Sequence, residues 1–188
     1  MLSSINLTLK YIIIYGIAAG MSYLHANDVI HRDLKPANIY LDSFYPKISG
    51  FNISKEINDN KIQPNETIKG TPAYIAPEIY LYKGYSKASD VYSFSLIVFE
   101  LLTGTKPYQM MMNPKEIKTE VVEKNYRPQL TNKIPKIYQD LIEKCWSPDP
   151  KDRPTFAEII NELENNTEYI NDDMDKFEIQ KYNFRKFD

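Results

Sequence analysis

The stretch from His31 to Asn38, which reads HRDLKPAN, constrains this chain more than any other part of its sequence. It directly follows an apolar segment, Tyr11 to Leu24, in which Ile13, Ile17 and Met21 recur at helical spacing. Such a stripe predicts the core helix of a soluble domain, and the segment is too short to span a bilayer. The fold must therefore bury this helix and present a charged polar loop immediately after it.

Length and composition indicate one compact domain. The chain has 188 residues, of which 43% are hydrophobic, which is typical of a soluble globular protein and leaves little room for a second domain. The net charge is only -2 and no long run of Lys or Arg occurs, so neither nucleic acid nor an anionic membrane is an expected partner. Cys145 is the single cysteine, so no intrachain disulfide can form and a reducing compartment, the cytoplasm, is expected.

Short strands and a long loop are expected after the first helix. The pieces with β-strand character are Val29–Ile30, Ile39–Leu41 and Lys47–Ser49. They are too short for a large sheet, so small hairpins are predicted. Residues 51–75 are polar and interrupted by Pro64, Gly70 and Pro72, which predicts a long surface loop.

Beyond Pro77 the pattern is helical. Ser89 or Ser86 can cap a helix that ends near Gly104 and is apolar nearly all round, which is typical of a central buried element. Further amphipathic helices are predicted at 114–122, 135–146 and 155–163.

The HRDLKPAN stretch resembles the catalytic loop of protein kinases. In that family, phosphoryl transfer uses a carboxylate that accepts the proton of the attacking hydroxyl, a cation on the transferred phosphate and an oxygen ligand for magnesium. The resemblance assigns these roles to Asp33, Lys35 and Asn38, with ATP and magnesium as cofactors. His31 and Arg32 are expected to be structural.

Four more stretches match the family in the same order. Residues 70–78, GTPAYIAPE, resemble the end of the activation segment and the substrate-docking loop, which contains Thr71. Residues 89–94 resemble the start of the central helix, where Asp90 would hold the backbone of the catalytic loop. Cys145-Trp146 and the sequence RPTF, which begins at Arg153, resemble the end of the lobe. There the resemblance implies a structural ion pair between Arg153 and Glu78.

The resemblance covers residues 10–165, leaving 1–9 as an N-terminal lead and 166–188 as a tail. It implies a mainly α fold, the C-terminal lobe of a kinase domain with short β-hairpins. The tail is either a frayed, disordered extension or a segment that docks its aromatic residues on the lobe or on a partner.

The subclass can also be read. Lys35 and Thr71 resemble serine/threonine kinases, whereas the CW and RPTF pieces are similar to tyrosine kinases and their tyrosine-kinase-like relatives, so the combination suggests the tyrosine-kinase-like group. Arg32 could bind a phosphate in the loop, with Thr67 as its acceptor. An ordinary loop threonine is an equally good interpretation of Thr67.

The sequence departs from the family where active kinases have Asp-Phe-Gly. Here the position reads Gly50-Phe51-Asn52, so the usual magnesium-binding carboxylate is absent and Asn38 has lost its partner ligand. Phe51 can still pack, and Asn52 is expected to tolerate the backbone angles that glycine normally serves.

Two further departures concern the nucleotide. No glycine-rich loop, Val-Ala-Ile-Lys strand or partnering glutamate helix precedes residue 10, so the N-terminal lobe is expected to be absent. Tyr40 stands where the family usually has a leucine that forms the floor of the adenine pocket. Apolar surface around Phe51 and Tyr40 should then be uncovered, which favours an obligate partner.

Three functions remain open. The first is a serine/threonine phosphotransferase that acts on a protein substrate and needs a missing N-lobe from elsewhere. The second is a pseudokinase-type scaffold for signalling that binds protein partners without metal. The third is a fragment of a longer active kinase. In every case we expect this chain alone to be inactive or impaired, because losing one preorganised group at a transition state costs about 3 kcal/mol or more.

Overall fold

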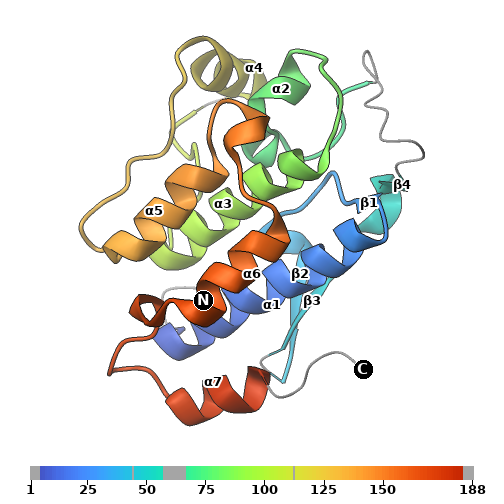
Figure 1. Ribbon diagram of the computed structural model, residues 1–188. Coiled ribbons are helices and arrows are strands. Elements are labelled where there is room, and N and C mark those ends of the chain that lie inside the picture. Colours follow the sequence, from blue (N-terminus) through green and yellow to red (C-terminus); the bar gives the residue numbers. More distant parts are fainter. Residues whose placement is uncertain (1–4, 44, 57–66, 112, 184–188) are drawn as a thin grey trace.

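The computed structural model describes residues 5–43, 45–56, 67–111 and 113–183. Most of the described chain is helical, and two short hairpin-like strand pairs lie on one side of the helices (Figure 1). The mainly α lobe with short β-hairpins that the resemblance implies is therefore confirmed.

Helix α1 (Leu7–Ala26) is the predicted core helix. It begins where the Asn6 side chain accepts a hydrogen bond of 2.8 Å from the Leu9 N–H, which satisfies one of the free donors of the first turn. It is the one described helix that is long and apolar enough to cross a membrane, but 56% of that stretch is buried inside the fold. It packs against both α3 and α6, as a core helix does.

Helix α3 (Lys87–Thr103) is the predicted central helix. Ser86 is its N-cap residue, and the Ser86 N–H donates to Ser89 Oγ at 3.1 Å, so both candidate capping serines take part. The helix ends at Gly104, whose φ of 69° is the left-handed conformation of a glycine C-cap. Its side chains from Ser89 to Leu101 are buried, as the all-round apolar pattern predicted.

The strands form two antiparallel pairs. Strand β1 (Val29–Ile30) pairs with β4 (Lys55–Glu56), and β2 (Ile39–Asp42) pairs with β3 (Tyr45–Ile48). Strands β1 and β2 flank residues 31–38 and belong to different pairs, and β1 and β3 both contact α1.

Short helices and turns complete the lobe. The 3₁₀ turns are η2 (Pro36–Asn38), η3 (Phe51–Ile53), η5 (Pro72–Tyr74), η7 (Pro150–Asp152) and η8 (Thr167–Tyr169). The remaining helices are α2 (Pro77–Tyr80), α4 (Pro114–Lys118), which continues into the π-helical η6 (Thr119–Glu123), α5 (Lys136–Cys145), α6 (Phe156–Asn165) and α7 (Lys176–Asn183). The three amphipathic segments predicted after residue 110 correspond to α4 with η6, to α5 and to α6.

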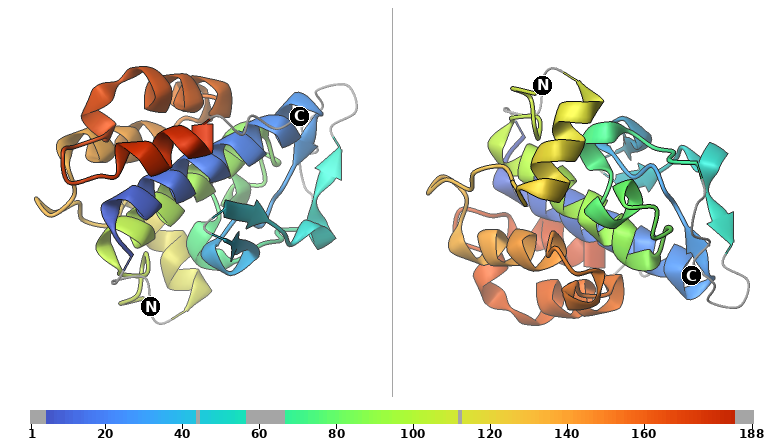
Figure 2. Two further views of the ribbon diagram at one scale, coloured as in Figure 1. Left: turned by 90° about the horizontal axis from the view of Figure 1, so that it is seen from below. Right: turned by 90° about the horizontal axis from the view of Figure 1, so that it is seen from above.

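The described part of the tail is packed on the lobe. The ring of Tyr169 is 1% exposed and lies edge-on against Tyr138 of α5, with 5.0 Å between the ring centroids. Helix α7 lies beside α1, where the Asp175 N–H donates to Thr8 Oγ1 at 2.8 Å (Figures 1 and 2). Where the sequence left a frayed extension and a docked segment both open, the structure places residues 166–180 against the lobe.

Candidate functional site

The catalytic-loop segment is anchored by Asp90, at the start of α3. The Asp90 carboxylate is 1% exposed and accepts hydrogen bonds from the backbone N–H of His31 (2.8 Å) and Arg32 (2.9 Å). His25, at the end of α1, lies within hydrogen-bonding distance of the same carboxylate, with Nε2 3.0 Å from Oδ2. A buried carboxylate needs such donors, and here they fix a loop whose Arg32 backbone has a φ of 72°.

Asp33, Lys35 and Thr71 form a closed polar triangle. Lys35 Nζ lies 2.7 Å from Asp33 Oδ2 and donates to Thr71 Oγ1 at 2.6 Å. The Thr71 hydroxyl donates in turn to Asp33 Oδ1 at 2.8 Å. The fold thus joins the catalytic-loop segment to the docking-loop segment, which are far apart in the sequence. Asp33 and Lys35 keep some solvent access, with side chains 17% and 23% exposed.

Asn38 closes the other side of Asp33. Its amide Nδ2 donates to the Asp33 backbone carbonyl at 2.7 Å and to the Asp33 carboxylate at 3.3 Å. The same side chain lies against Gly50, because a β-carbon on Gly50 would be 2.4 Å from Asn38 Cγ. The space that a side chain at residue 50 would enter is therefore already filled.

Gly50, and not Asn52, has the unusual backbone conformation. The φ of Gly50 is 85°, whereas Asn52 lies inside the 3₁₀ turn η3. The expectation that Asn52 takes over the role of the family's glycine is wrong. The left-handed conformation lies at Gly50, where glycine has no steric penalty.

Phe51 packs against His31 of the catalytic-loop segment. Its ring lies 5.2 Å from that of His31, centroid to centroid, and His31 Nε2 lies 2.8 Å from the Ser49 carbonyl oxygen. Phe51 remains 45% exposed, and Tyr40 on β2 is 61% exposed. Both aromatic side chains thus contribute to the uncovered surface that the sequence predicted.

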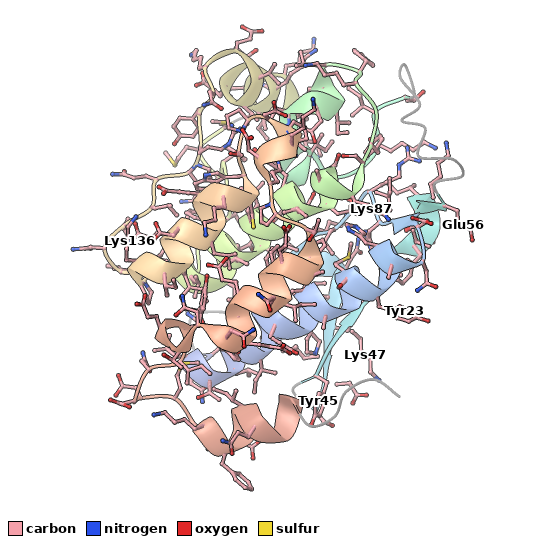
Figure 3. All side chains as sticks on the ribbon, in the orientation of Figure 1. Tyr23, Tyr45, Lys47, Glu56, Lys87 and Lys136 are labelled. Carbon is pink, nitrogen blue, oxygen red and sulfur yellow. The ribbon has the colours of Figure 1, made fainter. Side chains whose placement is uncertain are left out.

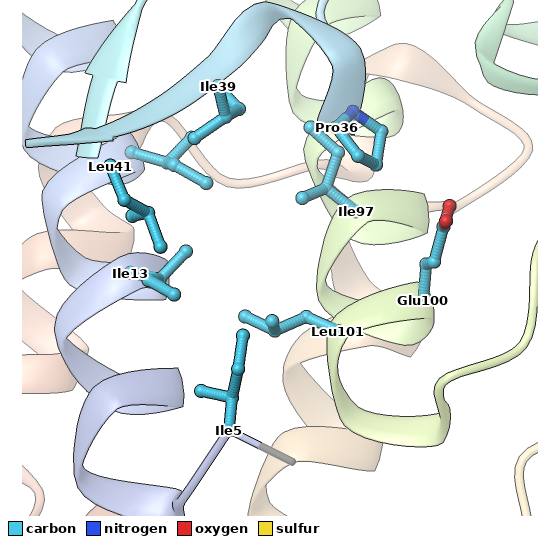
Figure 4. Close-up of a pocket in the computed structure, with 9 residues that line it drawn as sticks. Ile5, Ile13, Pro36, Ile39, Leu41, Ile97, Glu100 and Leu101 are labelled. Carbon is cyan, nitrogen blue, oxygen red and sulfur yellow. The ribbon is translucent and has the colours of Figure 1, made fainter. Parts of the chain in front are cut away.

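A small apolar pocket lies between α1, α3 and β2, on the face of β2 opposite to Tyr40 (Figure 4). Its volume is about 80 Å³, and Ile39 and Leu41, the neighbours of Tyr40 on β2, line one wall. The opposite walls are formed by side chains that include Ile13 and Leu101. Such a pocket accepts one aliphatic side chain and offers almost no polar group for a nucleotide.

The guanidinium of Arg32 lies over the aromatic ring of Tyr85. Its Cζ is 4.1 Å from the ring centroid of Tyr85, and Arg32 is 7% exposed. The Tyr85 hydroxyl holds the backbone of Lys69, since it accepts from the N–H and donates to the carbonyl oxygen, each at 2.6 Å. Thr67, the candidate phosphate acceptor, is exposed close by in the sequence.

Glu78 and Arg153 form a buried ion pair with two parallel bonds. Arg153 Nη1 lies 2.7 Å from Glu78 Oε1 and Nη2 lies 2.9 Å from Oε2, and the Arg153 side chain is fully buried. Arg153 also donates to the backbone carbonyls of Ala88 and Ser147, at 3.0 and 2.8 Å. The pair joins the docking loop to the end of the lobe.

Sequence reasoning missed three residues that hold this site together. His25 lies within hydrogen-bonding distance of the Asp90 carboxylate, the Tyr85 hydroxyl is hydrogen-bonded to the Lys69 backbone, and Tyr74 donates a hydrogen bond to Glu100 on α3. Burial, together with the Glu100 carboxylate, raises the pKa of Tyr74, so the phenol stays protonated as a donor. No local pattern marks these residues, because each contact joins segments distant in the chain.

A comparison with known protein families covers most of the chain, including the residues described above. Residues 2–163 match the family described as protein tyrosine and serine/threonine kinase. The chain belongs to the protein kinase family. Asp33, Lys35 and Asn38 lie within the matched residues.

Two curated relatives are named as serine/threonine kinases. The chain is 37% identical to the serine/threonine-protein kinase STY17 of Arabidopsis thaliana over 158 residues, which are 84% of this kinase chain and 27% of the relative. It is 40% identical to a probable serine/threonine-protein kinase of Dictyostelium discoideum over 157 residues, 83% of the chain and 12% of that relative. The chain thus spans about a quarter or less of the length of these relatives.

The kinase family uses ATP and magnesium, and the residues of this chain do not fit the metal. Gly50 offers no ligand, Asn38 fills the space beside it, and the Asp33 carboxylate is already bonded to Thr71 and Lys35. Within the described ranges, no group of three His, Cys, Asp or Glu side chains could hold an ion. Proteins usually hold magnesium by one or two carboxylates together with water and substrate phosphates, and Gly50 supplies no carboxylate at this position.

Proposed function

We propose that this chain is a kinase-family lobe that binds protein partners and does not itself transfer phosphate. The observation that carries the proposal is Gly50, which supplies no carboxylate at the position of the metal ligand and whose φ of 85° strains any residue with a side chain. The polar triangle of Asp33, Lys35 and Thr71 then serves to hold the docking loop in place. We assign the chain to the tyrosine-kinase-like group of serine/threonine type, as a pseudokinase-type lobe.

The size of the effect supports this assignment. Removing one preorganised group that stabilises a transition state lowers a rate by about 100- to 1000-fold. Magnesium neutralises the charge that develops on the transferred phosphate, so losing its ligand removes a contribution of at least this size. A kinase with a turnover of about 10 per second would then fall to at most about one event in ten seconds.

A thermal-shift titration tests the loss of nucleotide binding. The purified chain should melt at the same temperature with and without about 1 mM magnesium-ATP, because only a bound ligand stabilises the folded state. If the chain bound magnesium-ATP with a Kd of about one hundredth of that concentration, binding would add about 2.7 kcal/mol to the free energy of unfolding and raise the melting temperature by several degrees. Such a rise would overturn the proposal.

A matched variant isolates the residue responsible. Gly50→Asp supplies the missing carboxylate and keeps Asn38, the other ligand of the family, in place. The variant should remain folded by circular dichroism, and any magnesium-dependent shift that it shows and the native chain lacks would be due to residue 50. A shift of equal size in both proteins would contradict the proposal.

A second candidate is phosphotransfer as part of a longer kinase. It is favoured by the assembled contacts of Asp33 with Lys35 and Thr71, which place a carboxylate and a cation together at the docking loop. The relatives are several times longer than this chain, and the exposed Tyr40 and Phe51 offer a surface to an N-terminal lobe. Phosphorylation of a generic protein substrate by the chain, abolished by Asp33→Asn, would favour this second function.

A further inference from the structure

A second, larger groove lies at the end of α3 that is remote from Asp33. Its volume is about 470 Å³, within the usual range for ligand sites. Its walls come from the C-terminal turn of α3, the α3–α4 loop around Met110 and the segment between η6 and α5 that contains Tyr126 and Lys133. Figure 1 shows these two connections running along the same side of the lobe.

The floor of the groove is held rigidly. Tyr108 is 7% exposed, and its hydroxyl lies 3.0 Å from that of the buried Tyr92. Arg127 fixes the other wall, since it donates to the backbone carbonyls of Tyr126 (2.9 Å) and Trp146 (3.2 Å). Burial raises the pKa of Tyr108, so this link stays protonated at neutral pH. A preformed floor reduces the ordering cost of binding.

The rim offers exposed apolar side chains of adaptable shape. Met110 is 85% exposed and Tyr126 is 45% exposed, and Met111 also lines the groove. Flexible methionine thioethers fit partners of irregular shape, and tyrosine is enriched where partners bind. The groove is therefore suited to one apolar or aromatic side chain of a partner.

The charged groups of the lining are all basic. Lys106, which follows α3, and Lys133, which precedes α5, are both exposed, and no Asp or Glu occurs among the described lining residues. The chain as a whole carries a net charge of -2, so this groove differs locally from the rest of the protein. The complementary ligand carries negative charge beside its apolar group.

From these observations we infer that the groove is a docking site for an acidic peptide segment of a partner protein, with an aromatic side chain between the lysines. Two lysines are too few for nucleic acid, whose binders neutralise about 6 to 10 phosphates. Asp90 and Leu102 are separated along α3 by about 18 Å, so a docked peptide leaves Asp33 uncovered. This inference rests on the proposed function as a partner-binding lobe and names the chemistry of the partner; the docking site itself requires neither nucleotide nor metal.

Fluorescence anisotropy with a labelled peptide tests the docking site. The probe is the hexapeptide Asp-Glu-Glu-Phe-Glu-Asp, titrated with the full chain at roughly 50 mM salt and again at roughly 300 mM. Binding should weaken at the higher salt. Replacing the probe's Phe with Ala, or its acidic residues with Lys, should each reduce affinity at least about tenfold, which is about 1.4 kcal/mol.

Variants of the chain locate the site. Lys106→Glu with Lys133→Glu should weaken the probe about tenfold, whereas Lys151→Glu, an exposed lysine outside the groove, should leave affinity unchanged. Met110→Asp is a second test, because a side chain that is 85% exposed can be replaced without unfolding the lobe. It too should weaken binding.

Three results would overturn the inference. The first is that the Lys106/Lys133 double variant and the Lys151 variant bind the probe with equal affinity. The second is that the basic probe binds as tightly as the acidic probe. The third is that a single-stranded oligonucleotide of equal charge displaces the probe at equal concentration. None of these bears on Gly50, so failure here leaves the metal question to its own experiment.

Discussion

The side chain of Asn38 fills the position that a side chain at Gly50 would occupy, with Asn38 Cγ 2.4 Å from the site of the missing β-carbon. The two residues lie at opposite ends of the β2–β3 hairpin, and Ser49 N–H donates to the Asn38 carbonyl at 2.9 Å. The hairpin ladder thus sets the distance between them. A substitution at either residue therefore changes the space available to the side chain of the other.

The first prediction concerns substitution of Gly50. Gly50→Ala should lower the free energy of unfolding by about 2 to 4 kcal/mol, because alanine is strained at a φ of 85° and its methyl group meets Asn38. Gly84 provides a matched control, since its φ is 87°. Gly84→Ala should cost only the backbone strain of about 1 to 2 kcal/mol. Urea denaturation of both variants measures the difference.

A double variant separates the two contributions. Gly50→Ala with Asn38→Ala should be more stable than the sum of the single changes predicts, because the clash is then absent. Strict additivity would show that Asn38 does not fill the space beside Gly50.

The second prediction concerns the ion pair of Glu78 and Arg153. Arg153→Met keeps most of the side-chain volume but leaves the Glu78 carboxylate buried without its cation, which should cost about 3 to 5 kcal/mol of unfolding free energy. Lys176→Met removes an exposed ion pair with Asp172 and should cost less than about 0.5 kcal/mol. Chemical denaturation compares them. Similar losses in both variants would contradict the buried character of the first pair.

The third prediction concerns the tail. Tyr169→Ala should destabilise the lobe by about 3 kcal/mol, because its ring is buried against Tyr138 and its hydroxyl donates to Glu162 Oε1 at 2.9 Å. Phe177, on α7, is 72% exposed, and Phe177→Ala should change stability by less than about 0.5 kcal/mol. Thermal unfolding measures both. Equal, small effects would mean that the tail does not pack on the lobe in solution.

Local patterns in the sequence account for the main elements of the fold. The stripe of Ile13, Ile17 and Met21 predicted α1, and the serines before residue 90 with Gly104 bounded α3, because caps and periodicity act within a few residues. The roles of Asp90 and Glu78 came from the resemblance to kinases. Their partners, His31 and Arg153, lie far away in the sequence, so no local pattern could pair them.

What the sequence could not supply depends on tertiary contacts. The positive φ falls on Gly50 and not on Asn52, because the packing of Asn38 selects which residue must lack a β-carbon. In the same way, the tail's composition allows both an extension and a docked segment. The contact of Tyr169 with Tyr138 places the start of the tail on the lobe, and it requires the two surfaces to fit in three dimensions.

The fourth prediction concerns alkaline pH. Burial, assisted by the nearby Glu164 carboxylate, raises the pKa of Tyr11 from 10.0 to about 12, and the Tyr11 hydroxyl donates to the Leu163 carbonyl at 3.0 Å. The folded state therefore keeps a proton that the unfolded chain releases above pH 10. The stability from this group is complete below pH 10 and is lost as the pH rises towards 12.

Unfolding free energies at about pH 9 and about pH 11 test this coupling. Tyr11→Phe should lose less stability than the native chain between these two pH values, although it starts lower by about 1 kcal/mol because the hydrogen bond is missing. Tyr23 projects outward from α1 and is 67% exposed, so Tyr23→Phe should follow the native pH dependence (Figure 3). Identical slopes for the two variants would show that the Tyr11 phenol is not protected by the fold.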